Sequence, residues 1–156
     1  IDTQAVRGAT SLLSHRGPNN LGLYFSENRK VALGHTRLSI LDLSTNANQP
    51  IHSECKRYVM VYNGEVYNFK KLAEELQQPP PTPTGDTEII LRSFIQWGPS
   101  FVNKLNGMFA IAIWDNLKKK LHLFNEDKNP SWIIFIIFKD NCYLTITIIQ
   151  YSLFSF

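Results

Sequence analysis

The sequence is poor in the residues that mark disulfide-stapled and metal-binding proteins. Its two cysteines, Cys55 and Cys142, are too few for a disulfide scaffold and lack the spacing of metal ligands. The four histidines show no such spacing either, so we expect structural roles for His15, His35, His52 and His122. The sequence therefore predicts no metal site.

A strong excess of charge of one sign is also missing. The 16 lysines and arginines outnumber the 13 acidic residues by three, which gives a formal net charge of +3. The basic residues are scattered as pairs and one triplet, at residues 56–57, 70–71 and 118–120. Nucleic-acid binding needs a clustered basic face, so we expect no nucleic-acid partner.

Long hydrophobic runs are the third absence. The longest, residues 132–138, is far shorter than the ~20 residues of a membrane helix, so we expect no membrane partner.

No charged segment leads into an apolar run near the N-terminus, and the first residue is Ile1, so we expect a cut N-terminus without a signal peptide. With 44% hydrophobic and 19% charged residues, the sequence predicts a soluble, cytoplasmic globular domain.

What the sequence does contain is a mixture of short strands and helices. Hydrophobic periodicity predicts a helix at 2–13, strands at 21–25, 31–33 and 58–62, and a further apolar piece at 38–43. Two more helices are expected, one capped by Asn68 with Leu72 and Leu76 on its apolar face, and one beginning at Asp86 or Thr87. A proline-rich stretch at 79–83 predicts a stiff, extended connector between them.

The last third of the sequence predicts further strands. After a short helix at 99–105, a strand at 108–114 is apolar on both faces, which is typical of a central strand covered on both sides. Residues 121–124 form another strand, and 133–138 with 142–149 read as a terminal β-hairpin. The expected fold class is α+β, with stacked antiparallel sheets and helices outside them.

Four polar positions have both a structural and a functional interpretation. Asn63-Gly64 after a strand is most often a hairpin turn, but an amide and a backbone N–H there could also serve an oxyanion hole. Arg37 is either a surface arginine or a fork for a carboxylate. Asp86 is either a helix cap or a ligand contact, and Glu65 is most simply a solvated carboxylate.

Cys55 also has two interpretations. The neighbouring cations Lys56 and Arg57 could lower the pKa of its thiol and make it reactive. No base can be assigned to it from the sequence, so a bystander thiol is the favoured interpretation.

The order of the motifs carries more information than any one of them. Ser-His-Arg-Gly-Pro-Asn at 14–19 is followed by Ala-Leu-Gly-His-Thr-Arg-Leu-Ser-Ile-Leu-Asp-Leu-Ser at 32–44 and by Gln-Pro at 49–50. Tyr-Asn-Gly-Glu-Val-Tyr-Asn-Phe follows at 62–69, Asp-Thr-Glu-Ile-Ile-Leu at 86–91 and Leu-Asn-Gly-Met-Phe-Ala-Ile-Ala-Ile-Trp-Asp at 105–115. Over residues 5–128 this succession resembles the glutamine amidotransferase domain of asparagine synthase, a class II amidotransferase.

The resemblance implies a fold, a reaction and a set of site residues. The fold is the N-terminal-nucleophile sandwich, two antiparallel sheets between helical layers. The parent reaction is hydrolysis of L-glutamine to glutamate and ammonia for ATP-dependent asparagine formation. The implied roles are the α-carboxylate for Arg37, the α-ammonium for Glu65 and Asp86, the oxyanion hole for Asn63 and Gly64, and pocket-lining backbone for Leu38, Ile40 and Leu41.

The sequence also departs from the family pattern. The family's first strand and its cysteine nucleophile are absent, so we expect no glutaminase activity from this chain. The synthetase domain is absent too, and ATP and Mg²⁺ would belong to it, so we expect no cofactor here. We divide the chain into a partial amidotransferase domain at 1–130 and a divergent apolar tail at 131–156.

Two alternatives remain open. One is an inactive remnant that serves as a binding or interaction module, with the synthetase domain or a second copy of the chain as candidate partners. The other is an unrelated antiparallel interaction module in which Asn63-Gly64 is only a hairpin turn.

Overall fold

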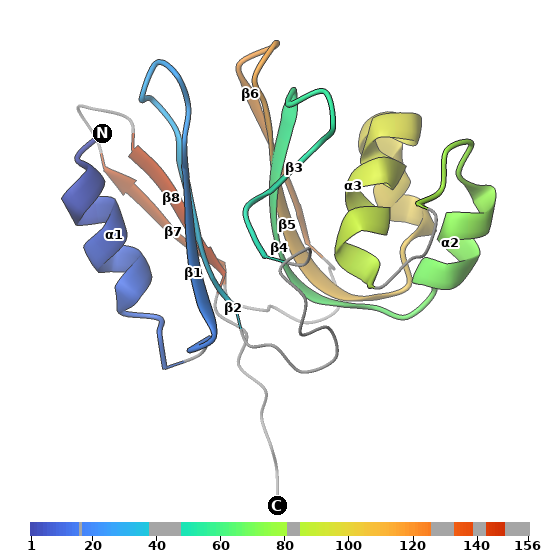
Figure 1. Ribbon diagram of the computed structural model, residues 1–156, viewed down its shortest axis with the longest axis horizontal. Coiled ribbons are helices and arrows are strands. Elements are labelled where there is room, and N and C mark those ends of the chain that lie inside the picture. Colours follow the sequence, from blue (N-terminus) through green and yellow to red (C-terminus); the bar gives the residue numbers. More distant parts are fainter. Residues whose placement is uncertain (16, 38–47, 81–84, 126–132, 139–142, 149–156) are drawn as a thin grey trace, which may run out of the picture.

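Two layers of β-strands face each other, with helices on the outside of both (Figure 1). This computed structural model describes residues 1–15, 17–37, 48–80, 85–125 and, as backbone strands, 133–138 and 143–148. The elements in chain order are α1 (Thr3–Ser11), β1 (Asn20–Phe25), β2 (Ala32–Arg37), β3 (Ile51–His52), β4 (Tyr58–Val66), α2 (Phe69–Glu75), α3 (Asp86–Trp97), the 3-10 helix η2 (Gly98–Lys104), β5 (Gly107–Asp115), β6 (Lys120–Asn125), β7 (Ile133–Phe138) and β8 (Tyr143–Ile148).

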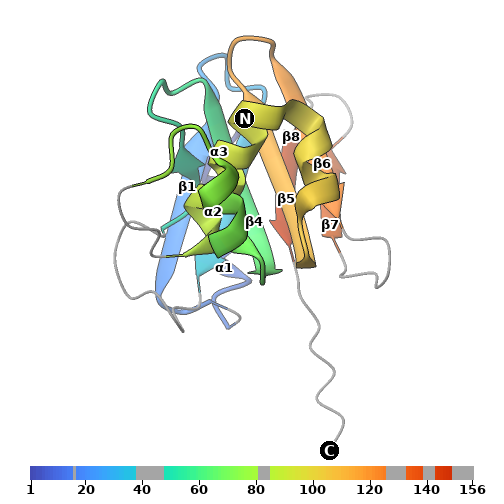
Figure 2. The same ribbon diagram turned by 90° about the vertical axis from the view of Figure 1, so that its right-hand side faces the viewer.

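All the strand pairs within the sheets are antiparallel. One layer is the sheet β3-β4-β5-β6. The other contains the pair β1-β2, and the pair β7-β8 continues this layer beside β2 (Figures 1 and 2). The α+β class with antiparallel strand layers and outer helices is therefore confirmed.

The hydrophobic core has two parts, one on each face of the β3–β6 sheet. Phe109, Ile111 and Ile113 on one face of β5 pack with the buried residues of α2, α3 and η2. Ala112 and Trp114 on the other face pack against β2 and its neighbours. The prediction of a central strand at 108–114 covered on both faces is thus correct, because a strand that is apolar on both faces removes both from water.

Helix α1 covers the outer face of the β1–β2 pair. Asp2 caps it, since its carboxylate accepts hydrogen bonds from the N–H groups of Gln4 and Ala5 at 2.8 and 3.3 Å. Thr10 packs directly over Gly34 of β2, where a Cβ atom would lie 2.3 Å from the threonine hydroxyl oxygen. Glycine at this position lets the helix approach the strand closely.

Asn68 lies at the expected start of α2 but does not cap it with its side chain. The amide of Asn68 donates to the carbonyl of Lys104 at 2.8 Å and accepts from the N–H of Asn106 at 2.9 Å. Both partners belong to the segment that leads from η2 into β5. The side chain therefore joins two chain segments instead of satisfying the helix's own N–H groups.

Several expected elements differ in length or fall outside the described residues. Strands β2 and β4 run further than the predicted 31–33 and 58–62, because polar residues continue the ladder where the apolar pattern stops. The apolar piece at 38–43 and part of the proline-rich connector lie outside the described residues. None of the described helices is long and apolar enough to cross a membrane.

Candidate functional site

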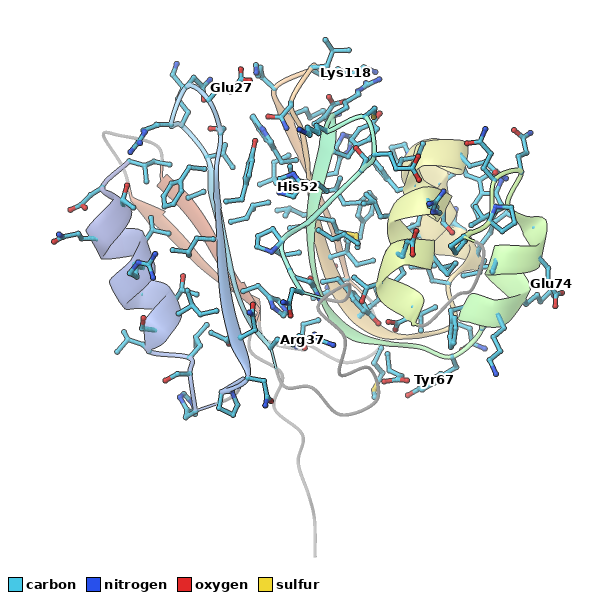
Figure 3. All side chains as sticks on the ribbon, in the orientation of Figure 1. Glu27, Arg37, His52, Tyr67, Glu74 and Lys118 are labelled. Atoms are coloured by element: carbon cyan, nitrogen blue, oxygen red, sulfur yellow. The ribbon has the colours of Figure 1, made fainter. Side chains whose placement is uncertain are left out.

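The side chains of interest gather at one end of the space between the two strand layers. Along β2, the inward-facing Leu33 is followed two and four residues later by His35 and Arg37, which share its face. Along β4, Val61 faces the same space, and Asn63 and Glu65 follow it at the same spacing. Figure 3 shows Arg37 at the lower end of this space, between the two layers.

Arg37 is buried, with 9% of its surface exposed. Its Nη1 atom donates a hydrogen bond to Oδ1 of Asn48 at 2.9 Å. The interpretation of Arg37 as a surface arginine is therefore wrong. A guanidinium is seldom buried without an acidic or polar partner, so its place between the layers is a first indication of a binding role.

Asn63 and Gly64 lie inside β4 and not in a hairpin turn. Asn63 is opposite Ala110 and Gly64 is opposite Phe109 in the ladder with β5. The hairpin-turn interpretation is therefore wrong, and with it the alternative of an interaction module built on that turn. Gly64 has a φ of 146°, and a Cβ atom there would lie 2.1 Å from the carbonyl oxygen of Met108, so the ladder requires glycine at this position.

The free edge of β4 presents backbone groups to the site. Strand β3 pairs with β4 only at Val59 and Met60, so β3 leaves the later part of this edge uncovered. Tyr62 exchanges two hydrogen bonds across the edge with the side chain of Gln49. Alternate residues of an antiparallel strand direct their N–H groups to the same edge, so the N–H of Gly64 points the same way as those of Tyr62 and Val66.

Asp86 occupies the next position along this edge. It is the first residue of α3, one place after the N-cap residue Gly85. Its Oδ2 atom accepts from the hydroxyl of Tyr62 at 2.5 Å and from the N–H of Val66 at 3.0 Å. The helix-cap interpretation of Asp86 is therefore wrong: the carboxylate joins α3 to the edge of β4.

The electrostatics of Tyr62 show that both carboxylates lie near it. Burial raises the pKa of the Tyr62 phenol most, and the negative charges of Asp86 and Glu65 raise it further. The phenol therefore stays protonated and donates its hydrogen bond to Asp86. Glu65 itself is exposed, as expected of a solvated carboxylate.

His35, for which the sequence predicts a structural role, lies on the same face of β2 as Arg37. Burial lowers the pKa of its ring to about 4, and the positive charge of Arg37 acts in the same direction, while a hydrogen bond to the Tyr62 backbone opposes them. The ring is therefore neutral at pH 7. Its Nδ1 atom is buried and has no hydrogen-bond partner. The signal in the sequence was its place between the inward-facing Leu33 and Arg37.

The sequence is similar to those of known proteins. Residues 2–128 match the family described as "Glutamine amidotransferase domain". The chain belongs to this family.

The individual relatives are larger proteins. The chain is 40% identical over 122 residues to the amidase chry2 of Gibberella zeae, covering 76% of this chain and 18% of the relative. It is 40% identical over 117 residues to asparagine synthetase B (glutamine-hydrolyzing) of Escherichia coli, covering 74% and 20%. It is 37% identical over 121 residues to asparagine synthetase (glutamine-hydrolyzing) 2 of Bacillus subtilis, covering 78% and 16%. The chain thus spans a fifth or less of the length of these relatives, and the predicted resemblance to the class II amidotransferase domain of asparagine synthase is confirmed.

Within this amidotransferase domain, the structure brings most of the predicted site residues together. Asn63, Gly64 and Glu65 are consecutive on β4, Asp86 is bonded to the same strand, and Arg37 faces the same space from β2. Leu38, Ile40 and Leu41 lie outside the described residues. Sequence reasoning missed His35, Gln49 and Tyr62, because their roles depend on contacts between distant segments.

Cys55 lies in the turn before β4, at the opposite end of that strand from Gly64. Its thiol is exposed, and a hydrogen bond with Ser53 is the main cause that lowers its pKa, followed by a backbone hydrogen bond with Arg57. The positive charge of Arg57 therefore lowers the pKa of the thiol less than the hydrogen bonds within this turn do. Among the residues with described side chains, no group of three His, Cys, Asp or Glu side chains could hold a metal ion.

Proposed function

We propose that the site binds L-glutamine between the two strand layers. The observation that carries this proposal is the placement of one buried cation, Arg37, opposite a strand edge with two carboxylates, Glu65 and Asp86. The α-carbon of a free amino acid carries one carboxylate and one ammonium group. A cation and a pair of acids on opposite walls therefore match it in charge.

Arg37 is assigned the α-carboxylate of glutamine. A guanidinium carries five N–H donors in a planar fork that suits a carboxylate, and the hydrogen bond to Asn48 is one of the contacts that orient it. Glu65 and Asp86 are assigned the α-ammonium. Asp86 uses Oδ2 for both of its bonds to β4, and Oδ1, which accepts a long hydrogen bond from the Thr87 hydroxyl at 3.5 Å, has a further lone pair for the ligand.

The side-chain amide of glutamine is assigned to Asn63 and Gly64. The N–H of Gly64 lies on the free edge of β4, and Asn63 supplies a carboxamide beside it. Two donors aimed at one carbonyl oxygen form an oxyanion hole, and each such donor contributes about 10²–10³ to the rate of acyl transfer. We assign the pocket-lining backbone to Leu38, Ile40 and Leu41.

We further propose that the fold is the N-terminal-nucleophile sandwich, with the amidotransferase part at residues 1–130 and a divergent tail at 131–156. The full-length relative would hydrolyse glutamine through a cysteine thiol and pass the ammonia to a synthetase domain served by ATP and Mg²⁺ in the cytoplasm. In this scheme the synthetase domain is the partner, and a second copy of the chain is a further candidate. The 156 residues hold cysteine only at positions 55 and 142, so we expect a polypeptide of these residues to bind glutamine without hydrolysing it.

Isothermal titration of the polypeptide with L-glutamine tests the proposal. Arg37→Ala should weaken binding about ten- to a hundred-fold, because a charge-assisted hydrogen bond contributes roughly 1.5–3 kcal/mol. Arg7→Ala removes an exposed arginine from α1 and serves as the matched control, which should bind as the wild type does.

Two results would contradict the proposal. Folded protein that gives no heat with millimolar glutamine would favour the alternative of a remnant that acts only as an interaction module. Equal weakening by Arg37→Ala and Arg7→Ala would place the ligand elsewhere. A glutaminase assay on the same sample completes the test, since ammonia release above a boiled control would overturn the expected inactivity.

A further inference from the structure

The side chain of Gln49 is bonded at both of its polar atoms to the backbone of one residue. Its Oε1 accepts from the N–H of Tyr62 at 2.5 Å, and its Nε2 donates to the carbonyl of Tyr62 at 2.9 Å. The residue is buried, with 7% of its surface exposed. The oxygen and nitrogen of the carboxamide therefore make the same pair of hydrogen bonds that the C=O and N–H of a neighbouring strand residue would make.

The register of β3 explains why a side chain takes this place. Ile51 lies opposite Met60 and His52 opposite Val59, so the continued ladder would put residue 49 opposite Tyr62. Pro50, which has no N–H group, separates residue 49 from the strand. The carboxamide of Gln49 thus makes the two hydrogen bonds to Tyr62 that the main chain of residue 49 would make if the pairing of β3 with β4 continued to it.

The same segment also contacts the opposite strand layer. A Cβ atom on Gly22 of β1 would lie 1.8 Å from the carbonyl oxygen of Gln49, so the backbone of Gln49 packs tightly on β1. Asn48, the preceding residue, accepts the hydrogen bond from Arg37. Asn48 therefore contacts Arg37 of one strand layer, and its neighbour Gln49 contacts the edge of β4 in the other layer.

Tyr62 connects Gln49 to Asp86, one of the two acidic residues of the candidate site. Its backbone is held by Gln49 and its hydroxyl by Asp86, while Gly64 and Val66 follow it on the same edge. We propose that Gln49 is a positioning residue for glutamine: its carboxamide holds the edge of β4 so that the Gly64 N–H and the Asp86 carboxylate lie at the correct separation from Arg37. This inference rests on the proposed function of the site.

Replacement of Gln49 by glutamate provides a test with a reversible chemical switch. A protonated carboxyl group can accept from the Tyr62 N–H and donate to the Tyr62 carbonyl, as the carboxamide does. An ionised carboxylate can only accept, and it would face the carbonyl oxygen. Burial favours the neutral form and raises the pKa of such a carboxyl, so the switch should operate in the mildly acidic range.

The experiment is titration with L-glutamine at a series of pH values, with each variant expressed relative to the wild type at the same pH. Gln49→Glu should bind at least ten-fold more weakly at pH 7 and regain most of the affinity near pH 5. Gln49→Met, uncharged and of the same length, should bind weakly at every pH.

Gln96→Glu is the matched control. The Gln96 carboxamide also bonds to backbone at both atoms, accepting from Gln77 at 2.8 Å and donating to Glu75 at 3.2 Å, but its partners lie on α2 and the chain after it. It should bind glutamine as the wild type does at every pH. Hydrogen exchange of the Gly64 amide gives an independent readout, and it should be faster in Gln49→Glu at pH 7 than at pH 5, relative to the wild type.

The outcomes separate this inference from the proposed function. If the wild type binds no glutamine, both fail. If the wild type binds and both Gln49 variants bind equally well at every pH, the role of Gln49 alone is overturned. If Gln49→Glu does not fold, Gln49→Met decides: normal affinity in the folded variant contradicts the inference, and weak affinity together with faster Gly64 exchange supports it.

Discussion

Gly64 shows how much one residue of the site depends on the absence of a side chain. Its φ of 146° is rarely adopted by other residues, and the carbonyl of Met108 occupies the space of a Cβ atom. Gly8 provides the contrast, since it lies inside α1 with nothing within 4 Å of a Cβ position. The two glycines therefore differ in what an alanine would meet.

We expect Gly64→Ala and Gly8→Ala to change the free energy of unfolding in opposite directions. Gly64→Ala should lower it by about 2 kcal/mol or more, because the backbone strain and the contact with Met108 add. Gly8→Ala should raise it by roughly 0.5–1 kcal/mol, because alanine favours a helix over glycine. Urea denaturation of both variants measures the difference, and a Gly64→Ala protein as stable as the wild type would contradict the described path of β4.

At this scale the sequence supplied candidate residues but not the contacts that hold them. Arg37, Glu65 and Asp86 could be proposed from the order of the motifs, which resembles that of the amidotransferase family. The burial of Arg37 and the bonds of Asp86 to β4 could not, since both depend on residues far away in the chain. Asn63-Gly64 misled the turn interpretation because local statistics take no account of the strand β5 opposite it.

Among the elements, α3 and β4 are joined by core packing and by hydrogen bonds to one carboxylate. The Asp86 carboxylate at the start of α3 accepts from the Tyr62 hydroxyl. Between the two strand layers, the Tyr24 hydroxyl of β1 donates a hydrogen bond at 2.7 Å to Asn116, which follows β5. Removal of either hydroxyl deletes one side-chain hydrogen bond, but only the first lies at the candidate site.

We expect Tyr62→Phe and Tyr24→Phe to have similar effects on stability and different effects on binding. Each should lower the free energy of unfolding by about 1 kcal/mol. Tyr62→Phe should also weaken glutamine binding several-fold, because Asp86 loses a donor that orients its carboxylate. Thermal denaturation and titration calorimetry on both variants check this, and equal affinities would show that the Tyr62 hydroxyl serves the fold alone.

Element prediction succeeded where the periodicity of hydrophobic residues was strong. The helix after Asp86 and the strand around Ile111 were expected from their apolar spacing, and both are present. Strand β3, at two residues, was too short for any pattern. The last part of β4 was missed because Asn63 and Glu65 face the site and break the apolar alternation.

At the scale of the whole molecule, the two parts of the hydrophobic core differ in polarity. The core between α3 and the β3–β6 sheet consists mainly of apolar side chains, with Ser93 of α3 as a buried polar residue. The core between the strand layers is apolar at Leu33, Val61 and Trp114 and becomes polar toward His35 and Arg37. The layered arrangement followed from strands that are apolar on both faces, but the polar end of the inner core appears only when the two layers are put together.

We expect acid to lower the free energy of unfolding in two separate pH windows, one set by His35 between the strand layers and one set by Asp115. Burial lowers the pKa of His35 to about 4 from an ordinary value of 6.5. A neutral buried ring stabilises the fold fully above pH 6.5, and this stabilisation is lost as the pH falls through about 4. Asp115 acts lower: the bidentate ion pair with Arg57 is the main cause that lowers its pKa from 3.8 to about 2, so its contribution is lost between those values.

Urea denaturation from pH 8 to pH 2 tests this in the wild type, His35→Gln and Asp115→Asn. The wild type should lose roughly 3 kcal/mol of unfolding free energy between pH 6.5 and pH 4 through His35. His35→Gln should abolish most of this loss and keep the loss below pH 4, whereas Asp115→Asn should do the reverse. Each variant is thus the control for the other, because the first window belongs to the space between the strand layers and the second to the turn after β5. An unchanged slope above pH 4 in His35→Gln would show that His35 is not the buried neutral group that links the pH response to the site.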